Sequence, residues 1–336
     1  MSKITLTDIS PSDKPWNVHK SESVKIAGIY AGSEAHARKG ERMGQCSGIL
    51  EFGEVADPET GEVKLRLINA RFCRVRYCPI CQWRRSLLWR AKFYQALPGI
   101  IAQHPKARFL FLTLTVENCR VGELRETLQR MNQAWRRFVL RKEFSSVIGW
   151  VRTTEVTREK ERPDYAHPHF HVLLMVPSWY FSGVAYVKHA AWTEAWKGAL
   201  RADYTPVVDV RTVKAKKKPK AGEAETPGLP HDGLVETLKY SVKPSDMAEA
   251  PDWFITMTEQ THRLRFIATG GLFKDVLKPE EKITEGEMIH LADEAPRNEL
   301  VHTIMRFLWE NDTGYILESM REASPQERAR LPDDPG

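Results

Sequence analysis

Hydrophobic residues occur in short blocks along this chain, and their spacing distinguishes strands from helices. Residues 109–116, 147–157 and 169–176 are apolar runs rich in β-branched and aromatic side chains, which is typical of buried strands. Residues 123–142 place large apolar side chains at every third or fourth position, which predicts an amphipathic helix. The same criteria predict further helices at 188–201, 234–243, 252–263 and about 297–321, and further strands at 207–213 and 264–269.

The order of these elements indicates the fold class. Pro163 and Asp164 lie in a short charged loop between two predicted strands, which are therefore expected to pair as hairpin neighbours. Strands separated by helices, with such a hairpin in the middle, are typical of an α+β domain. We predict that residues 105–275 form this domain around a central, mainly antiparallel sheet flanked by helices.

Three segments differ from this pattern. Residues 1–40 are polar and contain Pro11 and Pro15, so a loosely ordered N-terminus is expected. Residues 214–233 are rich in lysine, glycine, glutamate and proline and cannot bury enough apolar surface to order themselves, which predicts a surface loop. Residues 276–336 are expected to form a helical extension with a frayed tail.

The composition is that of a globular protein, with 42% hydrophobic and 28% charged residues. No apolar run approaches the ~18 residues of a membrane span, and the polar first residues do not resemble a secretory signal. We therefore expect a cytoplasmic protein without a membrane partner. The net charge of +6 suits a polyanionic partner such as nucleic acid, without establishing one.

Four of the five cysteines suggest a metal site in a basic module at residues 41–95. Cys78 and Cys81 have the spacing of a zinc knuckle, and Cys46 and Cys73 could complete a four-thiolate site. A redox dithiol has the same two-residue spacing, but two further cysteines upstream favour structural zinc. Cys119 follows a predicted strand and is expected to be a packing residue.

Basic and aromatic residues are concentrated in the same module. Guanidinium groups bind phosphates, and aromatic rings stack on unpaired bases. The residues expected to contact DNA are Arg74, Arg76, Arg84, Arg85 and Trp83. A solvated basic helix explains the same composition, so the cluster alone leaves both interpretations open.

Histidines alternate along the predicted strand that begins at His167. Side chains two residues apart leave the same face of a strand, so His169 and His171 are expected to point together at one ion while Phe170 points into the core. A core strand gains nothing from several ionisable rings, and histidine is the commonest metal ligand. Buried structural histidines are the alternative, which three histidines in five residues make less favourable.

A second candidate group lies on the predicted helix at 234–243. Glu236, Tyr240 and Lys243 are spaced i, i+4 and i+7 and therefore share one helical face. Tyrosine becomes a useful nucleophile when a base takes its proton or a cation stabilises the phenolate, and Glu236 and Lys243 could supply these functions. On spacing alone, an ordinary amphipathic helix with an i, i+4 Glu/Tyr pair is the better explanation of the group.

Taken together, these motifs resemble the HUH endonucleases, and in particular the single-tyrosine initiators of rolling-circle plasmid replication. The resemblance covers roughly residues 45–275 and follows the family's order of motifs. Its elements are Cys73 with Cys78–Arg85, Phe111–Thr115, Thr154–Thr157, His167–Leu173, and Glu236 with Lys239–Lys243.

The resemblance implies an HUH/RRM-like nuclease core and a specific chemistry. His169, His171 and Glu155 would bind Mg²⁺ or Mn²⁺, and Tyr240 would attack a phosphate of origin DNA that is single-stranded or extruded as a hairpin. This leaves a 5′-phosphotyrosine and a 3′-OH that primes the host polymerase, with a host helicase as a further partner. Glu236 would activate water at termination.

Less specific inferences concern two remaining residues. Lys243 would steady phenolate or phosphate charge, and His167 is a candidate substrate contact that ranks below the other two histidines. The loop at 214–233 separates the two halves of the expected site, so the sequence leaves the placement of the tyrosine helix unverified.

Other classes of protein share some of these motifs. A related HUH transposase or relaxase would use the same metal chemistry. A histidine-triad nucleotide hydrolase would explain His167, His169 and His171, but it leaves the cysteines and Tyr240 unused. A non-catalytic zinc-dependent DNA-binding regulator would explain the cysteines and arginines, but not histidines and a carboxylate facing a tyrosine.

Overall fold

The computed structural model describes residues 3–56, 63–213, 237–238, 241–274, 276, 283–291 and 301–325. The chain divides into two compact units, one made of Met1–Ala91 with Ile283–Gly336 and the other of Lys92–Lys282. The boundary falls within the long helix α4, Pro79–Gln103. Among the described helices, none has both the length and the hydrophobicity of a membrane-spanning segment.

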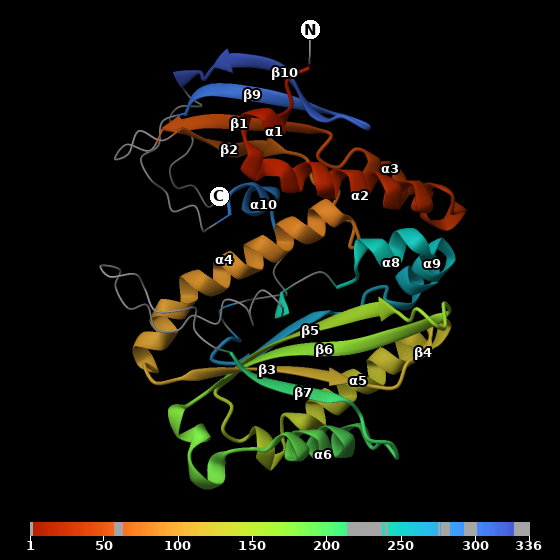
Figure 1. The fold of residues 1–336 in the computed structure, drawn as a ribbon, viewed down its shortest axis with the longest axis vertical. Helices are drawn as coiled ribbons and strands as arrows, with labels where there is room; N and C mark the ends of the chain where they lie inside the picture. Colours follow the sequence, from red (N-terminus) through yellow and green to blue (C-terminus); the bar gives the residue numbers. More distant parts are fainter. Residues whose placement is uncertain are drawn as a thin grey trace. The chain divides into compact units, whose positions relative to one another are not determined.

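The first unit is built on an antiparallel sheet with the strand order β10-β9-β1-β2 (Figure 1). Its strands are β1 (Ile49–Ala56), β2 (Val63–Ala70), β9 (Val301–Glu310) and β10 (Gly314–Glu322). Its helices, besides the first part of α4, are α1 (Leu6–Ile9), α2 (Lys14–Ala31), α3 (Ala37–Gly44) and α10 (Glu285–Ile289).

The N-terminus is helical, so the prediction of a loosely ordered segment at 1–40 was wrong. A capping box between Thr5 and Asp8 starts α1. In α2 the buried stripe includes Trp16, Lys20, Ser23, Ala27 and Tyr30 at helical spacing. Two of these buried positions are polar, which hid the helical pattern from a search for hydrophobic periodicity.

The predicted C-terminal helix at about 297–321 was also wrong, because residues 301–322 form the hairpin β9–β10. The turn has positive φ angles at Asp312 and Gly314, where a short polar residue and glycine are tolerated best. Strand β9 pairs with β1 from the opposite end of the chain. Local periodicity carries no information about such a distant partner.

The second unit contains a six-stranded sheet in which the order β7-β3-β6-β5-β8 is extended by β4 beside β6. All of its pairings are antiparallel. The strands are β3 (Arg108–Thr115), β4 (Cys119–Arg120), β5 (Gly149–Arg158), β6 (Tyr165–Val176), β7 (Val208–Val213) and β8 (Ile267–Gly271). The helices are α5 (Leu124–Phe138), α6 (His189–Leu200), α8 (Pro244–Glu249) and α9 (Pro251–Gln260).

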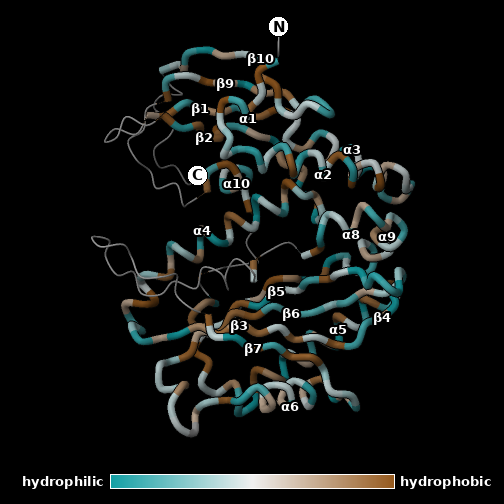
Figure 2. The backbone as a smooth tube through the Cα atoms, viewed as in Figure 1, coloured by the Kyte–Doolittle hydropathy of each residue, from teal (hydrophilic) through white to brown (hydrophobic). Residues whose placement is uncertain are grey.

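Helices α5 and α6 pack on one face of this sheet through aromatic side chains. Phe170 on β6 lies 6.2 Å from Trp135 of α5 and 6.1 Å from Trp196 of α6, measured between ring centroids. Figure 2 shows that β6 changes from hydrophilic to hydrophobic along its length, so its first half is the part that carries polar chemistry. The predicted α+β class, with antiparallel sheets flanked by helices, is confirmed.

Part of the predicted site lies outside the described residues. This applies to the loop at 214–233 and to Glu236 and Tyr240 of the predicted helix. Lys243 is described, and Pro244 after it begins α8.

Candidate functional site

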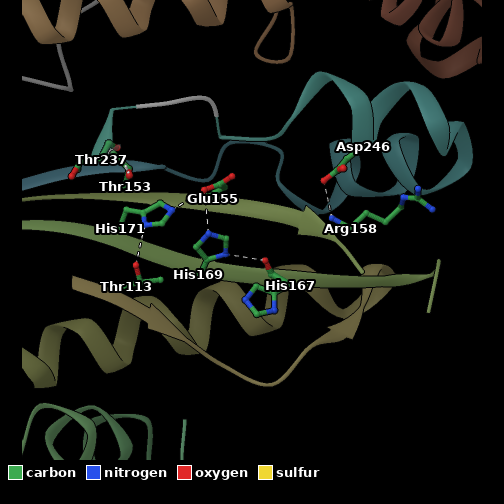
Figure 3. A network of polar contacts seen from close by, with 9 residues as sticks. All are labelled: Thr113, Thr153, Glu155, Arg158, His167, His169, His171, Thr237 and Asp246. Atoms are coloured by element: carbon green, nitrogen blue, oxygen red, sulfur yellow. Dashed lines mark hydrogen bonds and ion pairs between the residues drawn. The ribbon is translucent and has the colours of Figure 1, made fainter. Parts of the chain in front are cut away.

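The candidate site lies on the neighbouring strands β5 and β6 (Figure 3). Antiparallel pairing places Glu155 directly opposite His169. His171 leaves the same face of β6 two residues later, while Phe170 points to the opposite, helix-covered face. The Glu155 Oε2 atom lies 3.1 Å from His169 Nε2 and 2.7 Å from His171 Nε2. The sequence prediction that these side chains meet is therefore matched by the geometry.

The other nitrogen of each ring is turned away from this meeting point. His169 Nδ1 lies 3.2 Å from the carbonyl oxygen of His167, which can only accept, so Nδ1 carries the proton. In a neutral ring, His169 Nε2 is then an acceptor that faces the acceptor oxygen of Glu155. His171 Nδ1 similarly contacts Thr113 Oγ1 at 3.3 Å. Acceptors held this close need a shared proton or a cation between them.

The spacing of the three donor atoms fits a single metal ion. All three lie within 4.8 Å of one another. Ligands at ~2.1 Å from an ion and at right angles are about 3 Å apart, close to the two observed separations. Burial alone would raise the pKa of Glu155, but hydrogen bonding to His169 and His171, and the charge of these rings when they are protonated, hold this pKa well below its usual range. The ionised carboxylate and two imidazoles accept a divalent ion such as Mg²⁺ or Mn²⁺.

His167 belongs to a different hydrogen-bond chain. Its Nδ1 atom lies 2.6 Å from Asn118 Oδ1, and Asn118 Nδ2 donates to Glu159 Oε2 at 2.6 Å. The second bond orients the amide, so His167 Nδ1 is the donor in the first. Burial, followed by the charge of His169, lowers the pKa of His167. The ring is thus held in a neutral form that does not join the three-ligand cluster.

A pocket of about 520 Å³ opens over these residues. Its lining includes the three histidines and Glu155, together with Asn118, Thr157, Arg158, Glu159 and Lys243. Lys243 is exposed to solvent and comes from the segment that precedes α8. Among Glu236, Tyr240 and Lys243, the described residue is Lys243, and it lines the same pocket as the histidines.

The outer edge of β5 anchors the segment that leads to Lys243. Thr153 Oγ1 donates to the carbonyl oxygen of Thr237 at 2.5 Å. The amide of Val156 donates to the carbonyl oxygen of Ser241 at 2.9 Å. These two contacts lie on either side of Glu155 in the strand, so the described ends of the segment meet β5 next to the candidate metal site.

A second cluster of candidate ligands lies in the first unit. The sulfur atoms of Cys46, Cys73, Cys78 and Cys81 are buried and lie within 4.8 Å of one another. Three Sγ–Sγ separations are 3.7, 3.6 and 3.6 Å. These are far longer than the ~2.05 Å of a disulfide. A tetrahedral zinc ion with Zn–S bonds of ~2.3 Å requires sulfurs about 3.8 Å apart, so the four cysteines fit zinc.

The thiols strongly perturb one another. The hydrogen bond with Cys73 raises the pKa of Cys46. The hydrogen bond with Cys46 in turn raises the pKa of Cys81. Burial raises the pKa of Cys78, but hydrogen bonds with the other three cysteines and with Ser23 outweigh it and lower this pKa. Without metal, these hydrogen bonds favour ionisation of Cys78 over that of Cys46 and Cys81. Cys119, as predicted, is buried apart from the cluster.

The structure gives two of the predicted DNA-contacting arginines a different role. Arg84 is buried, with Nε and Nη2 donating to the carbonyl oxygens of Met288 and Ile289 of α10. Arg85 donates to the carbonyl oxygens of Cys81 and Arg76. Both guanidinium groups are occupied by backbone acceptors, so we withdraw these two arginines from the DNA-contacting set.

The remaining members of that set are more accessible. Arg74 is exposed and adopts a φ of 56° between two buried residues, and Arg76 is partly exposed. Trp83 is partly exposed and lies 4.8 Å from Trp16 and 4.9 Å from His19, measured between ring centroids. Nothing in these contacts prevents Arg74 from reaching a phosphate.

Three polar residues beside the two clusters were not among the predicted site residues. Asn118 has no motif of its own, and it reaches His167 because β4 pairs with the first residues of β6. Lys20 and Ser23 lie in the segment wrongly expected to be loosely ordered. The available signal was their position in the stripe that also contains Trp16 and Ala27.

Comparison with known proteins finds relatives over most of the chain. The model of a family described as a replication protein, Rep_1, matches residues 64–316. A protein from Streptococcus pneumoniae called Protein rep is 35% identical over 84% of this chain and 85% of its own length. A Protein rep from Lentilactobacillus hilgardii is 31% identical over 94% of this chain and 100% of its own length. No solved structure matches the chain.

Proposed function

Because this chain belongs to the Rep_1 family of replication proteins, we propose that it initiates rolling-circle replication of a plasmid by cutting one strand of the origin DNA. The earlier resemblance to plasmid replication initiators is confirmed at the level of this family. The finer proposal is that Tyr240 is the nucleophile. The observation that carries it is the convergence of Glu155, His169 and His171 in one pocket beside the segment that leads to Lys243.

Glu155, His169 and His171 are the proposed ligands of a divalent ion. Such an ion supplies Lewis-acid polarisation of the scissile phosphate. The protein's own contribution is to hold the ligands in place before the ion arrives. His169 is fixed through the backbone of His167, and His171 through Thr113. These outer contacts orient the ligand nitrogens toward the pocket.

Tyr240 is the proposed attacking group. Its phenolic oxygen would form a bond to the phosphorus as the bond to the 3′ oxygen breaks; the phenol loses one proton and the departing 3′ oxygen takes one up, so the step conserves protons. The products are a 5′-phosphotyrosine and a free 3′-OH that primes the host polymerase. Support for its proximity comes from its described neighbours, since Thr237 and Ser241 are bonded to β5 on both sides of Glu155.

The remaining groups are assigned by their chemistry and position. Lys243 lines the pocket, so its charge can stabilise a phosphate or a phenolate there. His167 also lines the pocket and is proposed as a contact of the DNA strand. Glu236 is proposed to activate water at termination, which would release the protein after the second cleavage.

Zinc is the proposed ion of the four-cysteine cluster, where it would hold the knuckle against the sheet of the first unit. Arg74 and Arg76, with Trp83, are proposed to contact origin DNA in a single-stranded or hairpin-extruded form. A host helicase is the expected partner for unwinding beyond the nick. A regulator without catalytic activity would have no use for a carboxylate and two histidines converging in one pocket.

The experiment that tests this function uses single-stranded candidate origin DNA with Mn²⁺. The protein is expected to form a covalent adduct that survives a denaturing gel, with a shortened DNA product bearing a 3′-OH. The adduct should disappear in chelator. Cleavage at an equal rate in chelator would contradict the metal-dependent mechanism, and absence of any cleavage on origin DNA would contradict the proposed activity.

A further inference from the structure

Lys20 is a buried cation in the first unit. Its side chain is 1% exposed and lies on α2, in the stripe that packs against the rest of the unit. Its Nζ atom donates to the carbonyl oxygen of Cys46 at 2.6 Å and to that of Gly44 at 2.9 Å. A buried ammonium group is costly unless negative charge lies nearby.

No carboxylate in the described part of the chain bonds to Lys20. The carbonyl oxygen that it bonds at 2.6 Å belongs to Cys46 of the four-cysteine cluster, and Ser23 on the same helix contacts Cys78 of that cluster. Neutral carbonyl oxygens satisfy the hydrogen bonds of an ammonium group but do not neutralise its charge. Among the described residues, the cysteine cluster is the source of negative charge that adjoins this ammonium group.

The charge of a zinc site supplies this requirement. A zinc ion bound by four thiolates carries two excess negative charges in a buried environment, which is itself unfavourable without compensation. A neighbouring ammonium group lowers the free-energy cost of burying this negative charge. The negatively charged metal centre likewise lowers the cost of burying Lys20. The two buried charges stabilise each other.

Helix α2 makes a second contact with the cluster, one helical turn after Lys20. The Oγ atom of Ser23, fully buried, lies 3.4 Å from Cys78 Sγ. A thiolate can only accept, so the hydroxyl donates once the metal is bound. The knuckle loop contributes similarly, since the amide of Val75 lies 3.4 Å from Cys73 Sγ.

We propose that α2 completes the zinc centre, with Lys20 as its buried counter-charge and Ser23 as a hydrogen-bond donor to Cys78. The inference rests on zinc binding by the four cysteines, as proposed above. It assigns a role to residues that precede the family match, which begins at residue 64. Groups that surround metal ligands in this way change metal affinity by roughly 10- to 100-fold.

A simpler role for Lys20 is to cap the C-terminal end of α3, where Gly44 is the last residue. The two roles predict different measurements. Loss of a cap destabilises the metal-free and zinc-loaded protein equally and leaves zinc affinity unchanged. Loss of a counter-charge weakens zinc binding itself.

The test measures zinc affinity of the full chain by competition with a chromophoric chelator. Lys20→Met is expected to weaken affinity about tenfold or more. Lys20→Arg, which keeps the charge, should recover part of that loss. Lys25→Met is the matched control, because Lys25 is an exposed lysine on the same helix and its replacement should leave affinity unchanged.

Ser23→Ala provides a second route if Lys20→Met does not fold. It is expected to weaken zinc affinity by several-fold, whereas Ser21→Ala on the exposed face of α2 should have no effect. Substitution with Co²⁺ adds a spectroscopic readout, because a four-thiolate site gives tetrahedral absorption bands that should remain in these variants.

The outcomes distinguish failure of zinc binding by the cysteines from failure of the roles of Lys20 and Ser23. If the wild-type protein binds no zinc, the zinc assignment itself is wrong. If wild type binds zinc, then unchanged affinity in Lys20→Met contradicts the role of Lys20. Where Lys20→Met does not fold, equal affinity of Ser23→Ala and Ser21→Ala contradicts the participation of α2.

Discussion

Glu155 on β5 lies directly opposite His169 on β6, and its carboxylate oxygen lies 3.1 Å from the Nε2 atom of that ring. The pairing of two antiparallel strands thus determines the separation of a carboxylate and an imidazole. His171 joins them from the next position on the same face, with Nε2 at 2.7 Å from the same oxygen. A rigid sheet therefore presents the proposed metal ligands without help from a loop.

Replacement of either histidine should abolish metal-dependent nicking. In His169→Ala or His171→Ala, the loss of one ligand is expected to lower the nicking rate about a hundredfold or more, because Lewis-acid stabilisation contributes several kcal/mol. The measurement is the initial rate of origin cleavage at fixed Mn²⁺. His302→Ala, at an exposed position on β9, is the control that should cleave normally. Equal rates in all three variants would rule out the ligand assignment.

Glu155 also predicts a dependence of stability on pH in the metal-free protein. Burial opposes ionisation, but its two histidine partners outweigh burial and lower its pKa. The ionised carboxylate therefore stabilises the fold at every pH above the pKa that Glu155 has in the unfolded chain. This contribution is lost as the pH falls through the lowered pKa of the folded protein. The free energy of unfolding of Glu155→Gln should consequently fall less steeply with acid. Chemical denaturation of both proteins in chelator measures it, and parallel pH profiles would contradict the prediction.

Loss of the hydrogen bond from Thr153 to Thr237 should lower stability and slow adduct formation more than the same change at the neighbouring Thr154. Thr153→Val removes a buried hydrogen bond and is expected to cost about 1 kcal/mol of stability. It should also slow adduct formation, because it loosens the segment that precedes Tyr240. Thr154→Val is a close control, since the buried Thr154 Oγ1 has no hydrogen-bond partner within the described residues. Comparison of unfolding curves and adduct yields decides the matter, and equal effects of the two changes would count against the anchoring role.

Replacement of one cysteine of the four-cysteine cluster should remove the bound zinc. Cys78→Ser is expected to lose bound zinc, because oxygen is a poorer ligand for a site built from thiolates. Cys119→Ser, at a buried cysteine outside the cluster, should retain one zinc per chain. Metal content by mass spectrometry of the purified proteins gives the answer. Zinc retained in Cys78→Ser, or absent from wild type, would be inconsistent with the assignment.

Five strands of the second unit's sheet could be predicted from sequence because β-branched and apolar residues mark them locally, whereas the two-residue β4 could not. The histidines could be predicted as a group because strand periodicity is two residues, and Glu155 followed from the neighbouring strand. Asn118 could not, because its contact with His167 depends on the pairing of β4 with β6. That pairing leaves no local pattern.

The first unit was predicted poorly for a related reason. Its sheet joins β1 to β9 across most of the chain, and non-local pairing is invisible to a local window. Its helix α2 buries Lys20 and Ser23 in the stripe where only apolar residues were sought. The clustering of basic and aromatic residues predicts a nucleic-acid contact at Arg84, but its side chain is buried and bonds the carbonyl oxygens of α10.

Adduct formation by Tyr240→Phe tests most directly whether Tyr240 is the nucleophile. Wild type and Tyr186→Phe, which alters an exposed tyrosine in the same unit, are incubated with single-stranded origin DNA and Mn²⁺ and then run on a denaturing gel. A covalent protein–DNA band is expected for both of these proteins and none for Tyr240→Phe. A band of normal intensity in Tyr240→Phe would show that the nucleophile is another residue.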